Sequence, residues 1–135
     1  MLKKHSINNK SIKVHCTDIK IELTTPDFSD DNLTDCYGHY IKRKNLIQIQ
    51  SSLSDIDEAN TIFHELMHCI AWLSCETNDG GALDKDDVEE RVINNFSNYW
   101  IGIFRENKWL LDYFKEKFSF RHFNSRLCPS SIIRS

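Results

Sequence analysis

The sequence predicts a small α+β domain, with a β-rich first third followed by helices. Apolar residues alternate with polar ones between Ile12 and Leu23, which is the period of half-buried strands. Two β-prone runs around a short polar stretch predict a hairpin over residues 37–50. Apolar residues then recur at helical spacing over residues 54–73 and 84–104. We therefore expect a small antiparallel or mixed sheet packed on two helices, with a further helix toward the C-terminus.

Length and cysteine content limit the class of protein. A chain of 135 residues has the size of one domain, and we expect that domain to span residues 1–118, followed by a C-terminal tail over 119–135. The five cysteines include no C-x-x-C pair, which argues against a complete disulfide framework. We see neither a membrane-spanning apolar run nor a secretory signal. We therefore expect a cytoplasmic protein without a membrane partner.

The predicted helix over residues 54–73 has clear start and stop signals. Ser54 is followed three positions later by Asp57, as at a capped helix N-terminus, and Gly80-Gly81 follows the last apolar residues. The sequence H-E-x-x-H at residues 64–68 falls in the middle of this helix. Its spacing is therefore meaningful as helix geometry.

The H-E-x-x-H sequence has the spacing of a metal site. His64 and His68 are four residues apart, so both imidazoles lie on one face of a helix and can bind one metal ion. Glu65 points about 100° away from His64 around the helix, which excludes it as a ligand of the same ion. It is instead placed to accept a proton from a metal-activated water. This is the arrangement that a zinc peptidase requires.

Catalytic zinc usually takes three protein ligands, so a further ligand has to be found. The metzincin solution requires a Gly and a third His after the motif, but Ala71 and Ser74 occupy those positions. Cys75 is nearly in line with His68, yet it lies roughly 10 Å along the helix axis. The third ligand should therefore come from another element.

The predicted helix over residues 84–104 carries two glutamates as candidates. Glu89 falls at the centre of the apolar stripe of this helix, and Glu90 lies about 100° away near its edge. A carboxylate on a buried face needs a strong partner because an unpaired buried charge is costly. We favour Glu89 as the third ligand, with Glu90 as the alternative.

Residues 35–110 resemble the small H-E-x-x-H metallopeptidase-like proteins of phages and mobile elements, related to the minimal zincins of the ImmA/IrrE type. The matching segments are Tyr37-Gly38-x-Tyr40, Ile47-Gln48-Ile49, Ser54-Asp55, the core at residues 64–68, Val88-Glu89-Glu90 and the region 104–107. In that family two histidines and a downstream glutamate hold zinc. The resemblance implies His64, His68 and Glu89 as Zn²⁺ ligands and Glu65 as the catalytic base.

The chain departs from this family in the glutamate helix. That helix usually continues E-x-x-A-N-x-F-A, whereas Glu89 is followed by Glu90-Arg91-Val92-Ile93-Asn94-Asn95-Phe96. The function implied is that of a gluzincin-like metallopeptidase acting on a restricted peptide or protein substrate. We expect an extended substrate to pair with the strand over residues 46–50. Candidates to stabilise the oxyanion are His39, Tyr40 and Tyr99, among which the sequence does not choose.

Two other functions compete with the peptidase. One is a zinc-stabilised binding or inhibitory module of phage or mobile-element origin that cleaves nothing. The other is a nucleic-acid factor, because residues 113–135 carry five Lys/Arg against one acidic residue, whereas residues 26–112 carry seven against seventeen. Such charge runs are usually solvated faces, so we expect no nucleic-acid partner. Glu65 favours the enzyme, since a purely structural zinc site needs no general base. The oligomeric state is left open.

Overall fold

A four-stranded mixed sheet supports the helices in the computed structural model, which describes residues 6–25 and 37–119. Its strands are β1 (Ser11–Val14), β2 (Thr17–Thr24), β3 (Gly38–Ile41) and β4 (Leu46–Gln50), in the order β1-β2-β4-β3. β1 pairs with β2 and β3 with β4 in antiparallel fashion, and β2 pairs with β4 in parallel. The predicted α+β class and mixed sheet are confirmed. The predicted tail lies outside the described residues beyond residue 119.

The predicted hairpin is formed by β3 and β4. A single 3-10 turn, η1 (Lys42–Lys44), connects the two strands, and Asn45 closes the connection in the left-handed conformation with φ of 48°. Asn tolerates this conformation better than most residues because its short amide can bond locally. Tyr40 is consequently opposite Ile47 across the ladder.

Three helices follow the sheet: α1 (Asp55–Leu73), α2 (Asp86–Glu106) and α3 (Lys108–Lys117). The predicted cap is present, since Ser54 Oγ accepts a hydrogen bond of 3.2 Å from the backbone N–H of Asp57. Among the helices that the structure describes, none has the length and apolar character needed to cross a membrane.

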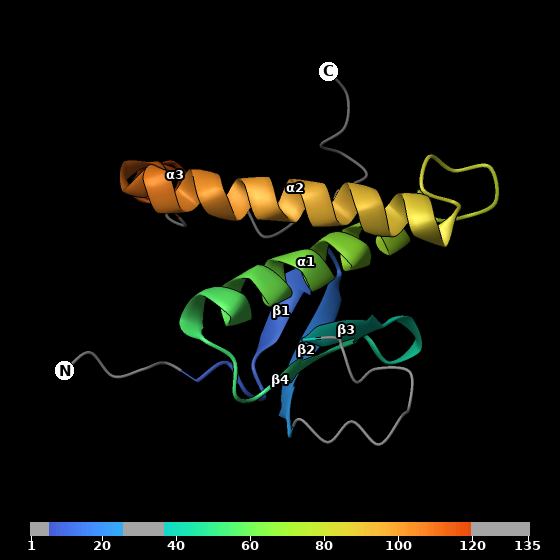
Figure 1. Cartoon of the computed structure of the whole chain (residues 1–135), viewed down its shortest axis with the longest axis horizontal. Helices are drawn as coiled ribbons and strands as arrows, with labels where there is room; N and C mark the ends of the chain where they lie inside the picture. Colours follow the sequence, from blue (N-terminus) through green and yellow to red (C-terminus); the bar gives the residue numbers. More distant parts are fainter. Residues whose placement is uncertain (1–5, 26–36, 120–135) are drawn as a thin grey trace.

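The helix α1 lies between the sheet and α2, so that the described chain forms three layers (Figure 1). Alternate residues of the two central strands point to α1 and form an apolar cluster with one cysteine of that helix; its buried members are Ile19, Ile21, Ile47, Ile49 and Cys69. Ile62, Leu66 and Leu73 of α1 pack against this cluster. The sheet therefore fixes one face of α1 and leaves another to meet α2.

The expectation that residues 46–50 pair with a substrate is wrong. These residues form β4, which lies inside the sheet and uses both of its edges, one toward β2 and one toward β3. A strand with both edges paired has no backbone groups left for another strand. The strand does lie against α1, but its place in the middle of the sheet leaves it no free edge for a substrate.

We predict that Gly38→Ala destabilises the protein. A Cβ atom at position 38 would lie 2.7 Å from Thr61 Cγ2 of α1 and 2.8 Å from the carbonyl oxygen of Gln48. Relief of this overlap requires movement of β3 away from α1 or β4, at a cost of about 1–3 kcal/mol. Urea unfolding followed by circular dichroism measures this loss.

Gly102→Ala is the matched control for that substitution. Gly102 lies within α2, and a Cβ there would meet nothing within 4 Å. Alanine should stabilise a helix interior at such a place by roughly 0.5–1 kcal/mol. Equal effects of the two substitutions would contradict the close approach of β3 to α1.

Candidate metal centre

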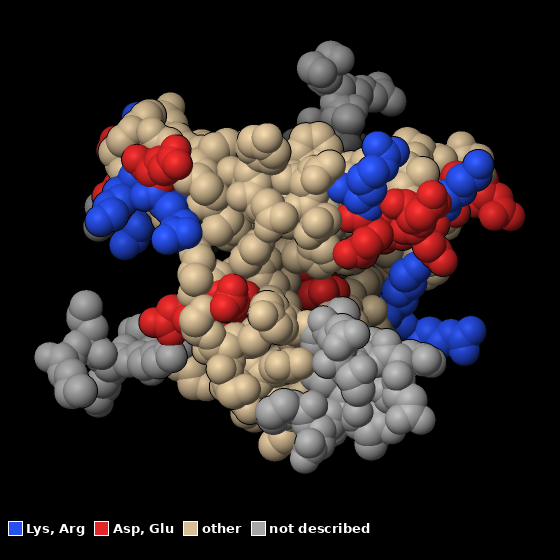
Figure 2. Space-filling model, in the orientation of Figure 1, with Lys and Arg blue, Asp and Glu red and all other residues tan. Residues whose placement is uncertain are grey.

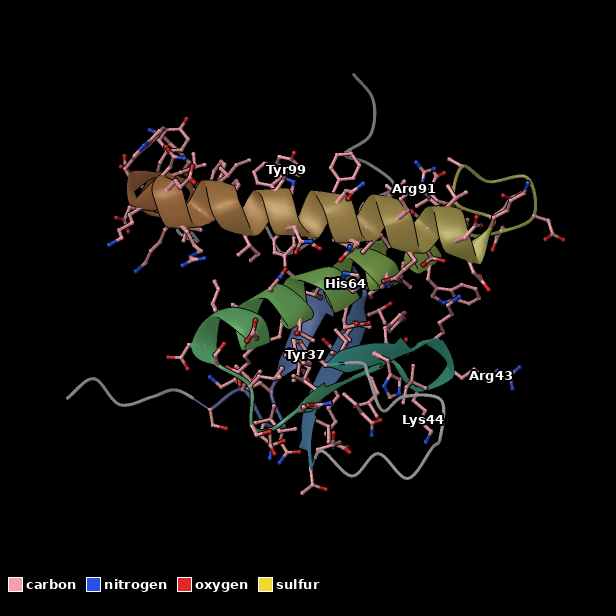
Figure 3. The ribbon with its side chains drawn as sticks, in the orientation of Figure 1. Tyr37, Arg43, Lys44, His64, Arg91 and Tyr99 are labelled. Atoms are coloured by element: carbon pink, nitrogen blue, oxygen red, sulfur yellow. The ribbon has the colours of Figure 1, made fainter. Side chains whose placement is uncertain are left out.

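The site lies between α1 and α2, which run antiparallel to one another. Asn60 in the second turn of α1 contacts Asn98 near the middle of α2, with 2.9 Å between Asn60 Nδ2 and Asn98 Oδ1. His68, two turns further along α1, contacts Glu89 in the first turn of α2. His64 lies between these contacts, in the layer between the two helices (Figure 3). Side chains spaced four residues apart on α1 thus form one row, and those on α2 form a second row that faces it.

His64, His68 and Glu90 bring their ligand atoms together. The two Nε2 atoms are 3.1 Å apart, His64 Nε2 is 3.2 Å from Glu90 Oε1, and His68 Nε2 is 3.0 Å from Glu90 Oε2. Ligand atoms around a tetrahedral zinc ion are separated by roughly 3.3 Å, given zinc–ligand bonds of about 2.0–2.1 Å. This trio is the group that the described residues offer for a metal ion. Two imidazoles and a carboxylate are a donor set that fits zinc.

The other nitrogen of each imidazole is held by a hydrogen bond. His68 Nδ1–H donates to Glu89 Oε1 over 2.7 Å. Ser97 Oγ donates its hydrogen to the carbonyl oxygen of Asn94 and therefore accepts from His64 Nδ1–H, at 3.4 Å. Both rings then carry their hydrogen on Nδ1 and direct an Nε2 lone pair into the cluster. Such outer hydrogen bonds orient metal-binding histidines in proteins.

Burial keeps His64 in the form that a metal ion requires. Removal of the ring from water lowers the pKa of His64, and the neighbouring His68 lowers it further, while the carboxylate of Glu90 acts in the opposite direction. The net direction is downward. His64 therefore favours the neutral imidazole, whose Nε2 lone pair can bind a cation.

Glu89 and Glu90 take different places in the site. The side chain of Glu89 is 8% exposed and bonds Nδ1 of His68, whereas that of Glu90 is 60% exposed and reaches the Nε2 atoms of both histidines. The structure thus brings Glu90, and not the favoured Glu89, into the trio. The reason is the orientation of α2, whose buried line is Glu89, Ile93 and Ser97. Around the axis of α2, the centre of these buried residues lies about 40° from the centre of the apolar stripe, on the side of Glu90.

Glu65 is buried beside the trio. It is 6% exposed, and burial raises its pKa to about 7, although nearby His68 and a hydrogen bond from the backbone N–H of Tyr40 act to lower it. Among the described residues, Glu65 lies outside the trio of His64, His68 and Glu90, as its direction on the helix predicts. A carboxyl group with a pKa near neutrality can both accept and return a proton.

A cavity of about 260 Å³ opens in front of these groups. It lies between the start of β3 and the facing rows of α1 and α2; its lining residues are Tyr37, Gly38, Asn60, Thr61, His64, Glu65, Glu90, Asn94 and Asn98. The cavity therefore places the proposed base, one histidine and Glu90 in contact with a common space. A small molecule or part of a chain that enters it would meet all three.

The predicted candidates for the oxyanion stabiliser do not line this cavity. Tyr99 is 76% exposed on the side of α2 turned away from α1 (Figure 3), and the buried Tyr40 hydroxyl lies beside Cys69, where burial and that contact raise its pKa to about 12. His39 is likewise absent from the lining. Cys75 is exposed and stands outside the trio, as expected.

The sequence interpretation missed three asparagines and Ser97. Asn60 precedes His64 by four residues, and Asn94 and Asn98 follow Glu90 by four and eight, so helical spacing could have found them. The family pattern supplies a second signal. When E-x-x-A-N-x-F-A is counted from Glu90 rather than Glu89, its Asn falls on Asn94 and its Phe on Phe96.

Acidic side chains gather near the N-terminal end of α2 (Figure 2). The first turn of this helix carries Asp86, Asp87 and Glu89, and Glu90 follows directly. The charges of these groups add, and their negative potential favours a bound cation close to that end of the helix.

Comparisons of the chain with family models, with curated proteins and with solved structures give no match.

We predict that the His68–Glu89 pair is energetically coupled. His68→Leu leaves the buried Glu89 carboxylate without its hydrogen-bond partner and should destabilise the metal-free protein by about 3 kcal/mol. Glu89→Leu in that background should restore part of the loss, because two apolar side chains leave no buried charge. A double-mutant cycle of urea unfolding in the presence of EDTA measures the coupling. Additive effects of the two substitutions would contradict it.

Proposed function

We propose that this protein is a zinc-dependent peptidase in which His64, His68 and Glu90 hold the ion and Glu65 is the general base. The observation that carries the proposal is the convergence of two Nε2 atoms, 3.1 Å apart, on both oxygens of one carboxylate. Acceptors that face one another at such distances repel unless a cation or a proton lies between them. A cation held between them would relieve this repulsion.

The position of Glu65 supports catalysis rather than a purely structural ion. Zinc, when bound, polarises a substrate carbonyl and lowers the pKa of a water molecule toward about 7. Glu65 borders the same cavity as His64 and Glu90, so its carboxylate can take a proton there and pass it to the leaving amine. A hydrogen bond from the backbone N–H of Tyr40 holds this carboxylate in place.

The size of the cavity supports a restricted substrate. At about 260 Å³ it is smaller than the 300–1,000 Å³ typical of ligand pockets, and it accommodates only a short part of a chain. The resemblance to the ImmA/IrrE type supports the same class of activity. Counted from Glu90, that resemblance also agrees with the proposed third ligand.

We predict different zinc contents for Glu90→Ala and Glu89→Ala. Loss of Glu90 removes a ligand and should leave the protein without zinc at stoichiometric metal, as should His64→Ala. Loss of Glu89 removes only the hydrogen bond to His68 Nδ1 and should weaken zinc binding by about 10–100-fold. Competition with a chromophoric chelator measures these affinities, and the reverse order would show that Glu89 is the ligand.

We predict that Glu65→Gln retains zinc and loses hydrolysis by about 10²–10⁴-fold, because glutamine cannot accept the proton. The assay follows new peptide ends by mass spectrometry in a proteome-derived peptide mixture. Glu58→Gln, two turns earlier on α1, is the matched control and should retain activity. Cleavage that survives Glu65→Gln contradicts the assignment of the base. A zinc-loaded wild type that cleaves nothing would instead favour the non-catalytic binding module.

A further inference from the structure

Three asparagines form a continuous row of side-chain amides along one side of the cavity. Asn60 Nδ2 donates to Asn98 Oδ1 over 2.9 Å, and Asn98 Nδ2 donates to Asn94 Oδ1 over 3.5 Å. The row therefore crosses from α1 to α2 and then runs along α2 toward Glu90. All three members line the cavity that holds His64 and Glu65.

The two ends of the row present complementary hydrogen-bonding groups. At one end, Asn60 Oδ1 is buried without a hydrogen-bond partner among the described residues, and a buried acceptor of this kind is costly to leave unpaired. At the other end, Asn94 uses its oxygen to accept from Asn98. Asn94 Nδ2 makes no hydrogen bond among the described residues, so its hydrogens are available to a ligand in the cavity. The row thus ends in an acceptor on α1 and a donor on α2.

We infer that this amide row binds the peptide main chain of the substrate. The inference rests on the proposed peptidase function and assigns it a binding element. Asn94 Nδ2–H donates to a substrate carbonyl oxygen in the cavity, and Asn60 Oδ1 accepts from a substrate backbone N–H when the Asn60 side chain turns toward the cavity that it lines. Asn98 touches neither group and is a positioning residue, since its amide fixes which way each neighbour faces.

The chemistry of the cavity favours main-chain recognition over recognition of an acidic side chain. The row is neutral, and no lysine or arginine lines the cavity in the described part of the chain. Glu65 and Glu90 would repel an acidic side chain. Alternating donors and acceptors are what a peptide backbone offers at every residue. We therefore expect the substrate class to be polypeptides without an acidic side chain at this site.

The experiment compares two zinc-binding probes on the zinc-loaded protein. Acetohydroxamate reports on the ion alone, whereas N-acetyl-alanyl-alanine hydroxamate adds two peptide units. Asn60→Ala and Asn94→Ala should each weaken the peptidyl probe about fivefold, as expected for one lost hydrogen bond, and leave acetohydroxamate and zinc content unchanged. Asn95→Ala is the control, because Asn95 does not line this cavity, and should alter neither probe.

A second measurement needs no metal and separates the inference from the proposed function. In metal-free wild type, N-acetyl-trialanine methylamide should shift the side-chain NH₂ resonances of Asn60, Asn94 and Asn98, but not those of Asn95. A protein that binds neither zinc nor acetohydroxamate fails as a zinc peptidase, yet selective shifts would still support the row. The inference would be overturned if the asparagine variants weakened binding of both hydroxamates equally. It would also be overturned if the peptide shifted the Asn95 resonances as much as those of Asn60, Asn94 and Asn98.

Discussion

The convergence of hydrogen-bond acceptors between α1 and α2 is the constraint on which the rest of the structure depends. His64 and His68 direct their Nε2 lone pairs at one another, and Glu90 directs both carboxylate oxygens at the pair. Before a cation is bound these acceptors repel one another, so contacts outside the cluster must hold the two helices together. The outer hydrogen bonds to Glu89 and Ser97 orient the rings, and both of these partners are buried. Polar groups thus occupy an interface where two amphipathic helices usually place apolar side chains.

The sheet provides the external support for that interface. Isoleucines of β2 and β4 pack on the face of α1 opposite to the site, together with the buried Cys69. Full burial of such a side chain contributes about 1.5–3 kcal/mol, which offsets part of the cost of placing Glu65 and Glu89 away from water. The close approach of β3 at Gly38 brings the hairpin onto the same helix. The apolar layer and the polar layer are therefore built on two faces of one helix.

Local signals in the sequence were enough to predict most of the fold. The Ser54 cap, the alternation through β2 and the polar turn before β4 each act over a few residues, and each appears in the structure. The choice between Glu89 and Glu90 depended instead on which side of α2 meets α1. The apolar stripe gave a misleading direction because part of it remains in contact with solvent, including Phe96 at 56% exposure and Tyr99. Rotation of a helix about its own axis is decided by tertiary packing, which a single-helix pattern does not contain.

The same limit applies to β4 and to the asparagines. A short strand such as β4 can lie at the edge or in the middle of a sheet, and only its pairing with β2 and β3 distinguishes the two positions. Asn60 and Asn98 are 38 positions apart, and their amides meet only because α1 and α2 run antiparallel. The spacing of His64, Glu65 and His68, by contrast, lies within one helix and could be interpreted directly.

The hydrogen bond that holds Glu65 comes from the main chain of Tyr40 and not from its side chain. Every amino acid except proline supplies a backbone N–H at that position. Substitution of residue 40 by another amino acid would therefore leave this hydrogen bond to Glu65 intact. Variation at Tyr40 among descendants of this chain would leave no trace of its part in the site, and searches that rank positions by invariance would overlook it.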